Sequence, residues 1–127
     1  MRYVVETEKS AEQAVADLKA AVERHGFGVL HVHDLKSTFA SKGFDFPHEC
    51  QILEVCNPQQ AINVLSEDMG LNIALPCRIS VYEEGGHTKI GMAKPTEMLE
   101  ALSDSPVLKQ IAEEVEAKTM QMINDAR

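Results

Sequence analysis

Apolar residues recur, partly in alternation with polar ones, over five short stretches of the chain. These stretches are residues 2–7, 27–34, 50–56, 77–83 and 87–93. Because successive side chains of a strand point to opposite faces of a sheet, the alternation predicts five β-strands. Residues 35–49 are less regular. Within them, residues 42–47 have the composition of a loop, where Pro47 argues against a central strand.

Helical periodicity predicts three helices between and after these strands. The first begins at the polar cap Ser10 and ends at Gly26, where the backbone can turn left-handed. Asn57-Pro58 begins the second and Ser105-Pro106 begins a long last one, because a polar cap followed by proline suits the first turn of a helix. Residues 95–102 are expected to add one or two helical turns.

The turn Gly85-Gly86 joins the last two predicted strands as a tight hairpin, so at least part of the sheet is antiparallel. The predicted order is β-α-β-β-β-β-α with a short extra helix among the strands. We therefore expect a single α+β domain over residues 1–127, with a mostly antiparallel sheet of about five strands and helices on one face. The other face would stay open to a partner or a small ligand.

Composition and charge narrow the classes of partner. Hydrophobic residues make up 44% and charged residues 25% of the 127, as in ordinary globular domains. The formal net charge is −8 and the 12 basic residues form no run, so we expect neither nucleic acid nor an anionic membrane as a partner. The first residues do not resemble a secretory signal, and no stretch approaches the ~20 apolar residues of a membrane span. We expect a cytoplasmic protein with reduced cysteines.

Two of the three cysteines are candidates for chemistry. Cys56 ends the third strand directly before Asn57, and the positive end of the following helix would favour its thiolate. If the third and fourth strands are antiparallel neighbours, Cys77 lies at the same end of the sheet, close enough for contact with Cys56. That arrangement would permit a dithiol, a persulfide carrier or two metal ligands. Alternatively, Cys56 is a small buried apolar residue, and Cys77 points into the core with Ile79 and Val81.

Histidines offer a candidate metal site. His31 and His33 alternate on one face of the second strand, with Val29 earlier on the same face. They are about 6.6 Å apart along the strand and could reach one metal ion, with His87 as a third ligand to test. The alternative is two solvated histidines on the open face, because two ligands do not define a metal site.

Glu54 is a candidate general acid or base in the middle of the third strand, on the face that it shares with Cys50 and Cys56. Desolvation would raise its pKa, unless a cation such as Arg78 pairs with it and leaves a paired or half-exposed charge. Cys50 is about 20 Å from Cys56 along a regular strand, too far for a disulfide. No glycine-rich phosphate loop, C-x-x-C or G-x-S-x-G motif is present, so the sequence leaves both a cofactor and enzymatic activity unknown.

Several short segments occur together in a specific combination. They are Gly26-Phe27, Lys42-Gly43, Ile52-Leu53-Glu54-Val55-Cys56-Asn57-Pro58, Ala61, Leu75-Pro76-Cys77-Arg78-Ile79 and Val81-Tyr82-Glu83. Together they resemble the Domain of Unknown Function 302 family over roughly residues 4–94. The resemblance implies a sheet with helices on one side, similar in outline to the TATA-binding-protein fold, and often a homodimer. It implies no established activity, and such a fold does not by itself indicate DNA binding.

These observations lead to three functional hypotheses. The first is a homodimeric binding or assembly module without catalytic activity, joined through the open face of the sheet or through a helix. The alternative is a thiol protein that handles sulfur or redox equivalents through Cys56 with Cys77. The third is a metal carrier that uses the histidines and cysteines.

Overall fold

Five strands form one sheet in the order β1-β5-β4-β3-β2 in the computed structural model, which describes residues 1–127. The strands are β1 (Arg2–Thr7), β2 (Gly28–Asp34), β3 (Cys50–Cys56), β4 (Cys77–Glu84) and β5 (His87–Ala93). Each neighbouring pair is antiparallel. The predicted fold class, α+β with an antiparallel sheet of five strands, is therefore confirmed.

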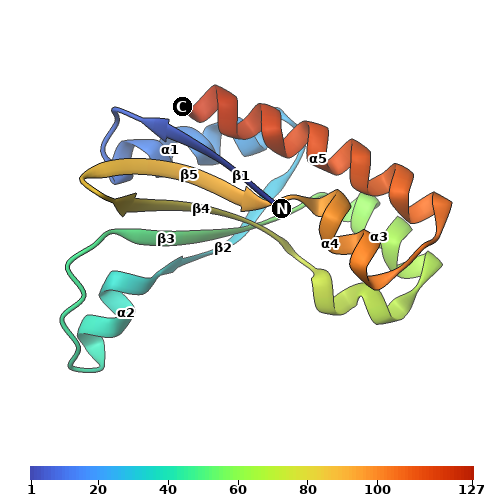
Figure 1. Ribbon diagram of the computed structural model, residues 1–127, viewed down its shortest axis with the longest axis horizontal. Helices are drawn as coiled ribbons and strands as arrows, with labels where there is room; N and C mark the ends of the chain where they lie inside the picture. Colours follow the sequence, from blue (N-terminus) through green and yellow to red (C-terminus); the bar gives the residue numbers. More distant parts are fainter.

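Two long helices cover one face of the sheet, as Figure 1 shows. They are α1 (Ala11–Arg24) and α5 (Pro106–Ala126). Ser10 caps α1 by accepting a hydrogen bond from the Gln13 amide at 3.1 Å, and Ser105 caps α5 in the same way through the Leu108 amide. Both predicted helix starts are confirmed.

The core lies between these helices and the sheet. Its fully buried side chains come from alternate strand positions and from one face of each helix. They include Leu18, Leu53, Ile79, Ile90, Met122 and Ile123. Because alternate residues of a strand point the same way, the opposite face of the sheet carries the intervening residues and has no long helix over it. We call it the open face.

Three short elements lie beyond one end of the sheet (Figure 1). The helix α3 (Pro58–Glu67) follows β3, the 3-10 helix η1 (Met69–Ala74) precedes β4, and α4 (Pro95–Leu102) follows β5. Proline stands at the first position of α3 and of α4, so the chain leaves each strand directly into a helix. This group of helices forms a lobe at the end of the sheet.

The opposite end of the sheet carries an element that the sequence pattern does not predict. Leu35–Ser41 form α2, which begins where the Asp34 side chain accepts a hydrogen bond from the Ser37 amide at 3.1 Å. No residue of α2 is buried, so it has no apolar stripe to reveal it. The expected irregular segment is thus a short helix followed by a loop, and Figure 1 shows it projecting from the sheet.

A β-bulge corrects the predicted faces of β2. Val29 pairs with Val55 and His31 pairs with Glu54, so the register shifts between Val29 and His31. The bulged residue, Leu30, is 61% exposed. Strict alternation would put Val29 and His31 on one face, whereas the extra residue turns Val29 towards the core side and His31 to the open face.

The hairpin between β4 and β5 turns at Gly85 and Gly86, with φ angles of 61° and 79°. Both values lie in the left-handed region that glycine tolerates without strain, as the sequence predicts.

None of the helices is both long enough and apolar enough to span a bilayer.

Candidate functional site

A cavity of about 520 Å³ opens between the end of the sheet and the lobe formed by α3, η1 and α4. Of the 23 residues that line it, 16 are hydrophobic. Binding sites for small molecules typically measure about 300–1,000 Å³ and are mostly apolar, so both volume and lining fit such a site. We call it the sheet-end cavity.

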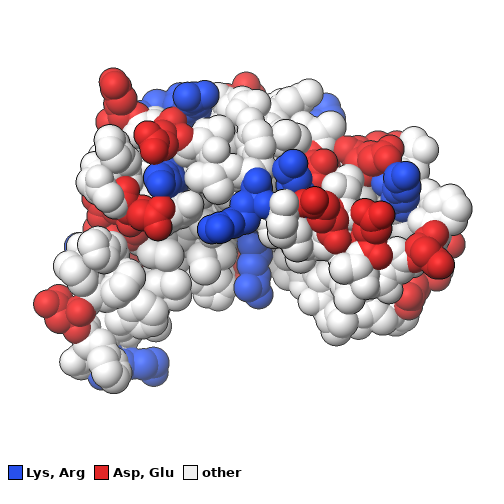
Figure 2. Space-filling view, viewed as in Figure 1, with Lys and Arg blue, Asp and Glu red and all other residues white.

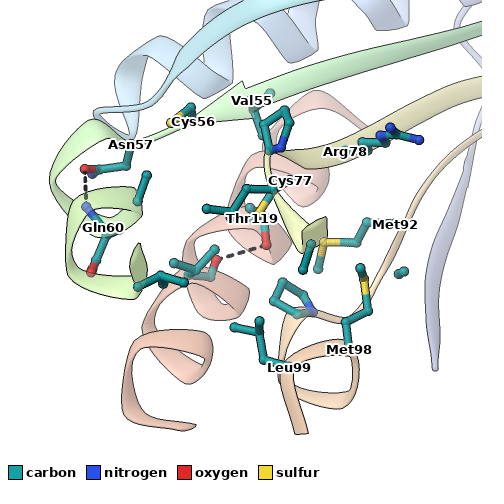
Figure 3. A pocket seen from close by; sticks show the side chains of 18 of the residues that line it. Val55, Cys56, Asn57, Gln60, Cys77, Arg78, Met92, Met98, Leu99 and Thr119 are labelled. Carbon is teal, nitrogen blue, oxygen red and sulfur yellow. Dashed lines mark hydrogen bonds between the residues drawn. The ribbon is translucent and has the colours of Figure 1, made fainter. Parts of the chain in front are cut away.

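The walls of the sheet-end cavity come from four parts of the fold. The sheet contributes Val55 and Met92, and α5 contributes Val115 from the face that it turns to the sheet. The lobe contributes Val64 of α3 and also Leu99 of α4, which Figure 3 labels. The cavity exists because α3 and α4 begin at the strand ends and splay outward, instead of packing against the sheet as α1 and α5 do.

The two candidate thiols, Cys56 and Cys77, lie at this end of the sheet, and both border the cavity. Val55 pairs with Cys77 across β3 and β4, which places Cys56 next to Cys77 at the same end of neighbouring strands. This placement agrees with the sequence prediction, and the two Cα atoms are about 6 Å apart if strand geometry is regular. Their side chains start from opposite faces of the sheet, however, and point apart in Figure 3. All three cysteines are free.

Burial raises the pKa of both thiols. Desolvation, with a smaller effect of the neighbouring Cys56, raises the pKa of Cys77 to about 11. Cys77 keeps some accessible surface because it borders the cavity, yet protein atoms surround it on most sides. Desolvation also raises the pKa of Cys56, which opposes the expected stabilisation of its thiolate by the start of α3. One amide of that first turn already donates to the Asn57 side chain, at 3.2 Å from Gln60.

Most polar groups of the cavity lining serve the fold. The buried Thr119 hydroxyl donates to the main-chain oxygen of Val115 at 3.0 Å, and the Gln60 side chain donates to Glu114 at 3.1 Å. Arg78 is the single charged residue of the lining, and it makes no salt bridge. The cavity therefore contains no nucleophile paired with a base, and its one charge stands free.

Glu54 lies on the open face and is paired. His33 Nε2 lies 2.9 Å from Glu54 Oε1, and His31 lies opposite Glu54 across β2 and β3. The hydrogen bond from His33, with smaller contributions from the charges of His33, Arg78 and His31, holds the pKa of Glu54 below its ordinary value. The predicted raised pKa is wrong, and the paired alternative applies, with His33 in place of Arg78 as the partner.

The histidines do not form a three-ligand cluster. His31 and His33 lie together, with ring centroids 4.4 Å apart. His87 begins β5 beside the hairpin, and two strands, β4 and β3, lie between it and β2. No group of three His, Cys, Asp or Glu side chains is placed to hold a metal ion. The structure thus separates His87 from the pair that it was expected to complete.

The sequence did not reveal the cavity, and Arg78 entered only as a partner for Glu54. Two prolines, Pro58 and Pro95, could have indicated the cavity, because each starts a helix directly after a strand. Two such helices at one sheet end leave space between them. The size of that space depends on packing, which the pattern does not contain.

Comparisons with known proteins agree with this architecture. A family model described as Domain of unknown function DUF302 matches residues 3–126. The crystal structure of an uncharacterized conserved DUF302 protein from Bacillus stearothermophilus is similar, with 36% sequence identity and a TM-score of 0.93. The similarity covers 99% of this chain and 98% of that one. No curated protein matches the chain.

Proposed function

The chain belongs to the Domain of Unknown Function 302 family, and from its geometry we propose that it is a non-catalytic module that binds a small, mostly apolar molecule in the sheet-end cavity. The observation that carries the proposal is the cavity itself, with its volume of about 520 Å³ and its apolar lining. Apolar surface that faces water is unfavourable, at roughly 25 cal/mol per Å². A ligand that covers this lining recovers that free energy.

A binding role fits the chemistry of the lining better than a catalytic role. The Thr119 hydroxyl is occupied by a helix carbonyl, and the Asn57 side chain is occupied by the cap of α3. Catalytic groups usually have pKa values near the working pH. The pKa of the Cys77 thiol, about 11, is far from that range.

Binding can be tested with the neutral fluorescent probe N-phenyl-1-naphthylamine. We expect saturable binding to the wild type and a loss of affinity of at least about tenfold in Ala61→Phe, because the new ring occupies the cavity that Ala61 borders. The matched control is Ala101→Phe, the same change at an exposed alanine of α4 that does not border the cavity. Equal affinity of both variants would place the probe elsewhere and contradict the proposal.

We propose further that the module is a homodimer. The support for a second copy as the partner comes from the arm formed by residues 35–49. α2 has seven residues and none is buried, although isolated helices shorter than about 12–15 residues are marginal in water. The rings of Phe39 and Phe46 contact each other at 5.3 Å between centroids, while Phe44 is 69% exposed. A standard interface buries roughly 800 Å² on each partner, which is more than the short arm alone is expected to supply. We therefore propose that the dimer interface consists of the arm together with the open face of the sheet beside it.

Light scattering coupled to size exclusion tests the dimer. We expect a dimer for the wild type at about 100 µM protein, and a shift towards monomer in Phe44→Ser because that ring would be lost from the interface. Val107→Ser, at an exposed apolar position of α5, is the control that should leave the mass unchanged. A wild-type monomer at this concentration would contradict the dimer and leave the ligand proposal standing.

Charge supports a partner other than nucleic acid. Figure 2 shows several Lys and Arg side chains together near the middle of the face in view, with Asp and Glu side chains on both sides of them. The net charge of −8 adds a long-range repulsion towards phosphate backbones. The cytoplasmic location and the reduced cysteines expected from the sequence stay predictions.

The alternative function is a thiol protein that uses Cys56 with Cys77. It has less support, because burial raises the pKa of both thiols. Alkylation of Cys56 by iodoacetamide between pH 6 and pH 9, in a Cys50→Ser, Cys77→Ser background, tests it. A rate that levels off below pH 8 would reveal a thiolate and favour the thiol hypothesis. A rate that still rises at pH 9 would contradict it.

A further inference from the structure

We propose that the ligand of the sheet-end cavity is an amphiphilic anion, in which an apolar chain or ring carries a carboxylate, and that Arg78 binds the carboxylate at the rim. This inference rests on the proposed ligand-binding function and adds the chemical class of the ligand. Its basis is the position of one unpaired cation beside an otherwise uncharged, apolar cavity.

Arg78 is the only residue of the lining that carries a charge. It is exposed, and its guanidinium takes part in no salt bridge and no side-chain hydrogen bond, unlike Lys36 and Lys89, which pair with glutamates. A guanidinium presents five N–H donors in a planar fork that matches a carboxylate. Arg78 therefore brings a vacant anion-binding group to the cavity.

Cavity geometry connects this group to the apolar interior. Cys77 and Val55 line the cavity from the core side of the sheet, whereas Arg78 and Ile52 line it from the open face. The cavity thus passes around the beginning of β4, from the core side to the open face. Figure 3 shows Arg78 extending along the sheet, away from Cys56 and Cys77. A ligand with its apolar part inside would have its polar end on the side where Arg78 lies.

Glu54, the acidic residue opposite Arg78 in the sheet, does not form a salt bridge with it. Glu54 is opposite Arg78 in the pairing of β3 and β4, but its carboxylate is bound by His33 at 2.9 Å. The influence of Arg78 on Glu54 is through charge alone. Because His33 satisfies Glu54 from the β2 side, the Arg78 guanidinium remains available for a carboxylate from outside the protein.

A second donor stands beside Arg78. Ser80 lies two residues further along β4, on the same face, and it also borders the cavity. Its hydroxyl makes no hydrogen bond within the chain, so it can donate to a ligand oxygen. The rest of the surface carries a net negative charge, which disfavours anions that bind without such specific partners.

The test compares decanoate with decanol, which share the apolar tail and differ in the charged group. Each displaces bound N-phenyl-1-naphthylamine at pH 8 from the wild type, Arg78→Gln, Arg78→Lys and the control Arg24→Gln. Arg24 is exposed at the end of α1, which packs on the opposite face of the sheet, and it does not line the cavity, so this control removes the same charge elsewhere. We expect Arg78→Gln to weaken decanoate about fivefold, the scale of an exposed ion pair, and to leave decanol unchanged.

The outcomes separate this inference from the proposed function. Arg78→Lys should keep part of the decanoate affinity, because the charge stays and only the planar fork is lost. If the probe binds but decanoate is equally tight in wild type, Arg78→Gln and Arg24→Gln, the anion inference is overturned while the cavity remains a ligand site. If the probe does not bind the wild type at all, the proposed function itself fails.

Discussion

We predict that the protein loses stability at alkaline pH because Cys77, in the wall of the cavity, is largely buried. The pKa of this thiol rises from its ordinary value of 9.0 to about 11 because burial disfavours the thiolate. Between these values the unfolded chain releases the proton and the folded protein keeps it. The unfolded state then binds fewer protons, so the free energy of unfolding falls as the pH rises from about 9 towards 11.

The size of this effect follows from the two pKa values. Their full difference corresponds to about 2.7 kcal/mol in the free energy of unfolding. At pH 10.5 the linkage relation gives a loss of about 2 kcal/mol relative to pH 7.5. Near pH 7.5 the effect is negligible, because the thiol is almost fully protonated in both states.

Urea unfolding at pH 7.5 and pH 10.5 measures the effect, with Cys77→Val as the comparison. Valine has a similar shape and no proton to lose, while every other titrating group stays the same in both proteins. We expect the stability difference between variant and wild type to shift by about 2 kcal/mol in favour of the variant on going to pH 10.5. Parallel pH profiles for the two proteins would refute the reasoning, because they would mean that Cys77 is not desolvated.

Three further substitutions test other parts of the structure. Gly91→Ala should cost about 1–3 kcal/mol in unfolding free energy, because the new Cβ would lie 2.9 Å from Val4 Cγ2, and adding Val4→Ala should restore part of it. Purely additive costs of the two changes would contradict this. Glu54→Gln should flatten the fall in thermal midpoint as the pH drops below about 4.5, because the hydrogen bond from His33 lowers the pKa of Glu54 and its contribution is lost as the pH falls through the folded pKa. An unchanged acid profile would show that the pair is not formed in solution. Asn57→Ala should destabilise by about 1 kcal/mol in urea unfolding, whereas Asn57→Ser, which retains a capping oxygen, should cost less.

The strands and the long helices could be predicted from the sequence because their buried faces impose a period on the chain. Ile79 and Val81 alternate with the polar residues Arg78 and Ser80, and Ser10 and Ser105 mark helix starts through specific hydrogen bonds. Elements without a buried face leave no such period. For that reason α2 was missed, and so was the bulge at Leu30, which adds a single residue to a strand that otherwise alternates.

The candidate site was predictable only as far as topology determines it. The adjacency of Cys56 and Cys77 follows from antiparallel neighbours, because the chain leaves and re-enters the sheet at the same end. Their pKa values depend on how many atoms surround each sulfur, which no spacing of residues encodes. Likewise His87 was a chemically sensible third ligand, but the strand order places it away from His31.

The two kinds of wall around the sheet-end cavity have consequences for how this family can diversify. One wall consists of strands and α5, whose residues also form the core, so a substitution there changes stability as well as ligand. The other wall is α3, η1 and α4, which have few buried residues between them. Mutations in that wall, at positions other than the buried Val64 and Leu71, should reshape the cavity at a smaller cost in folding free energy than mutations in the first wall. Under the proposed binding function, ligand preference could therefore change, or be redesigned in the laboratory, while the scaffold stays constant.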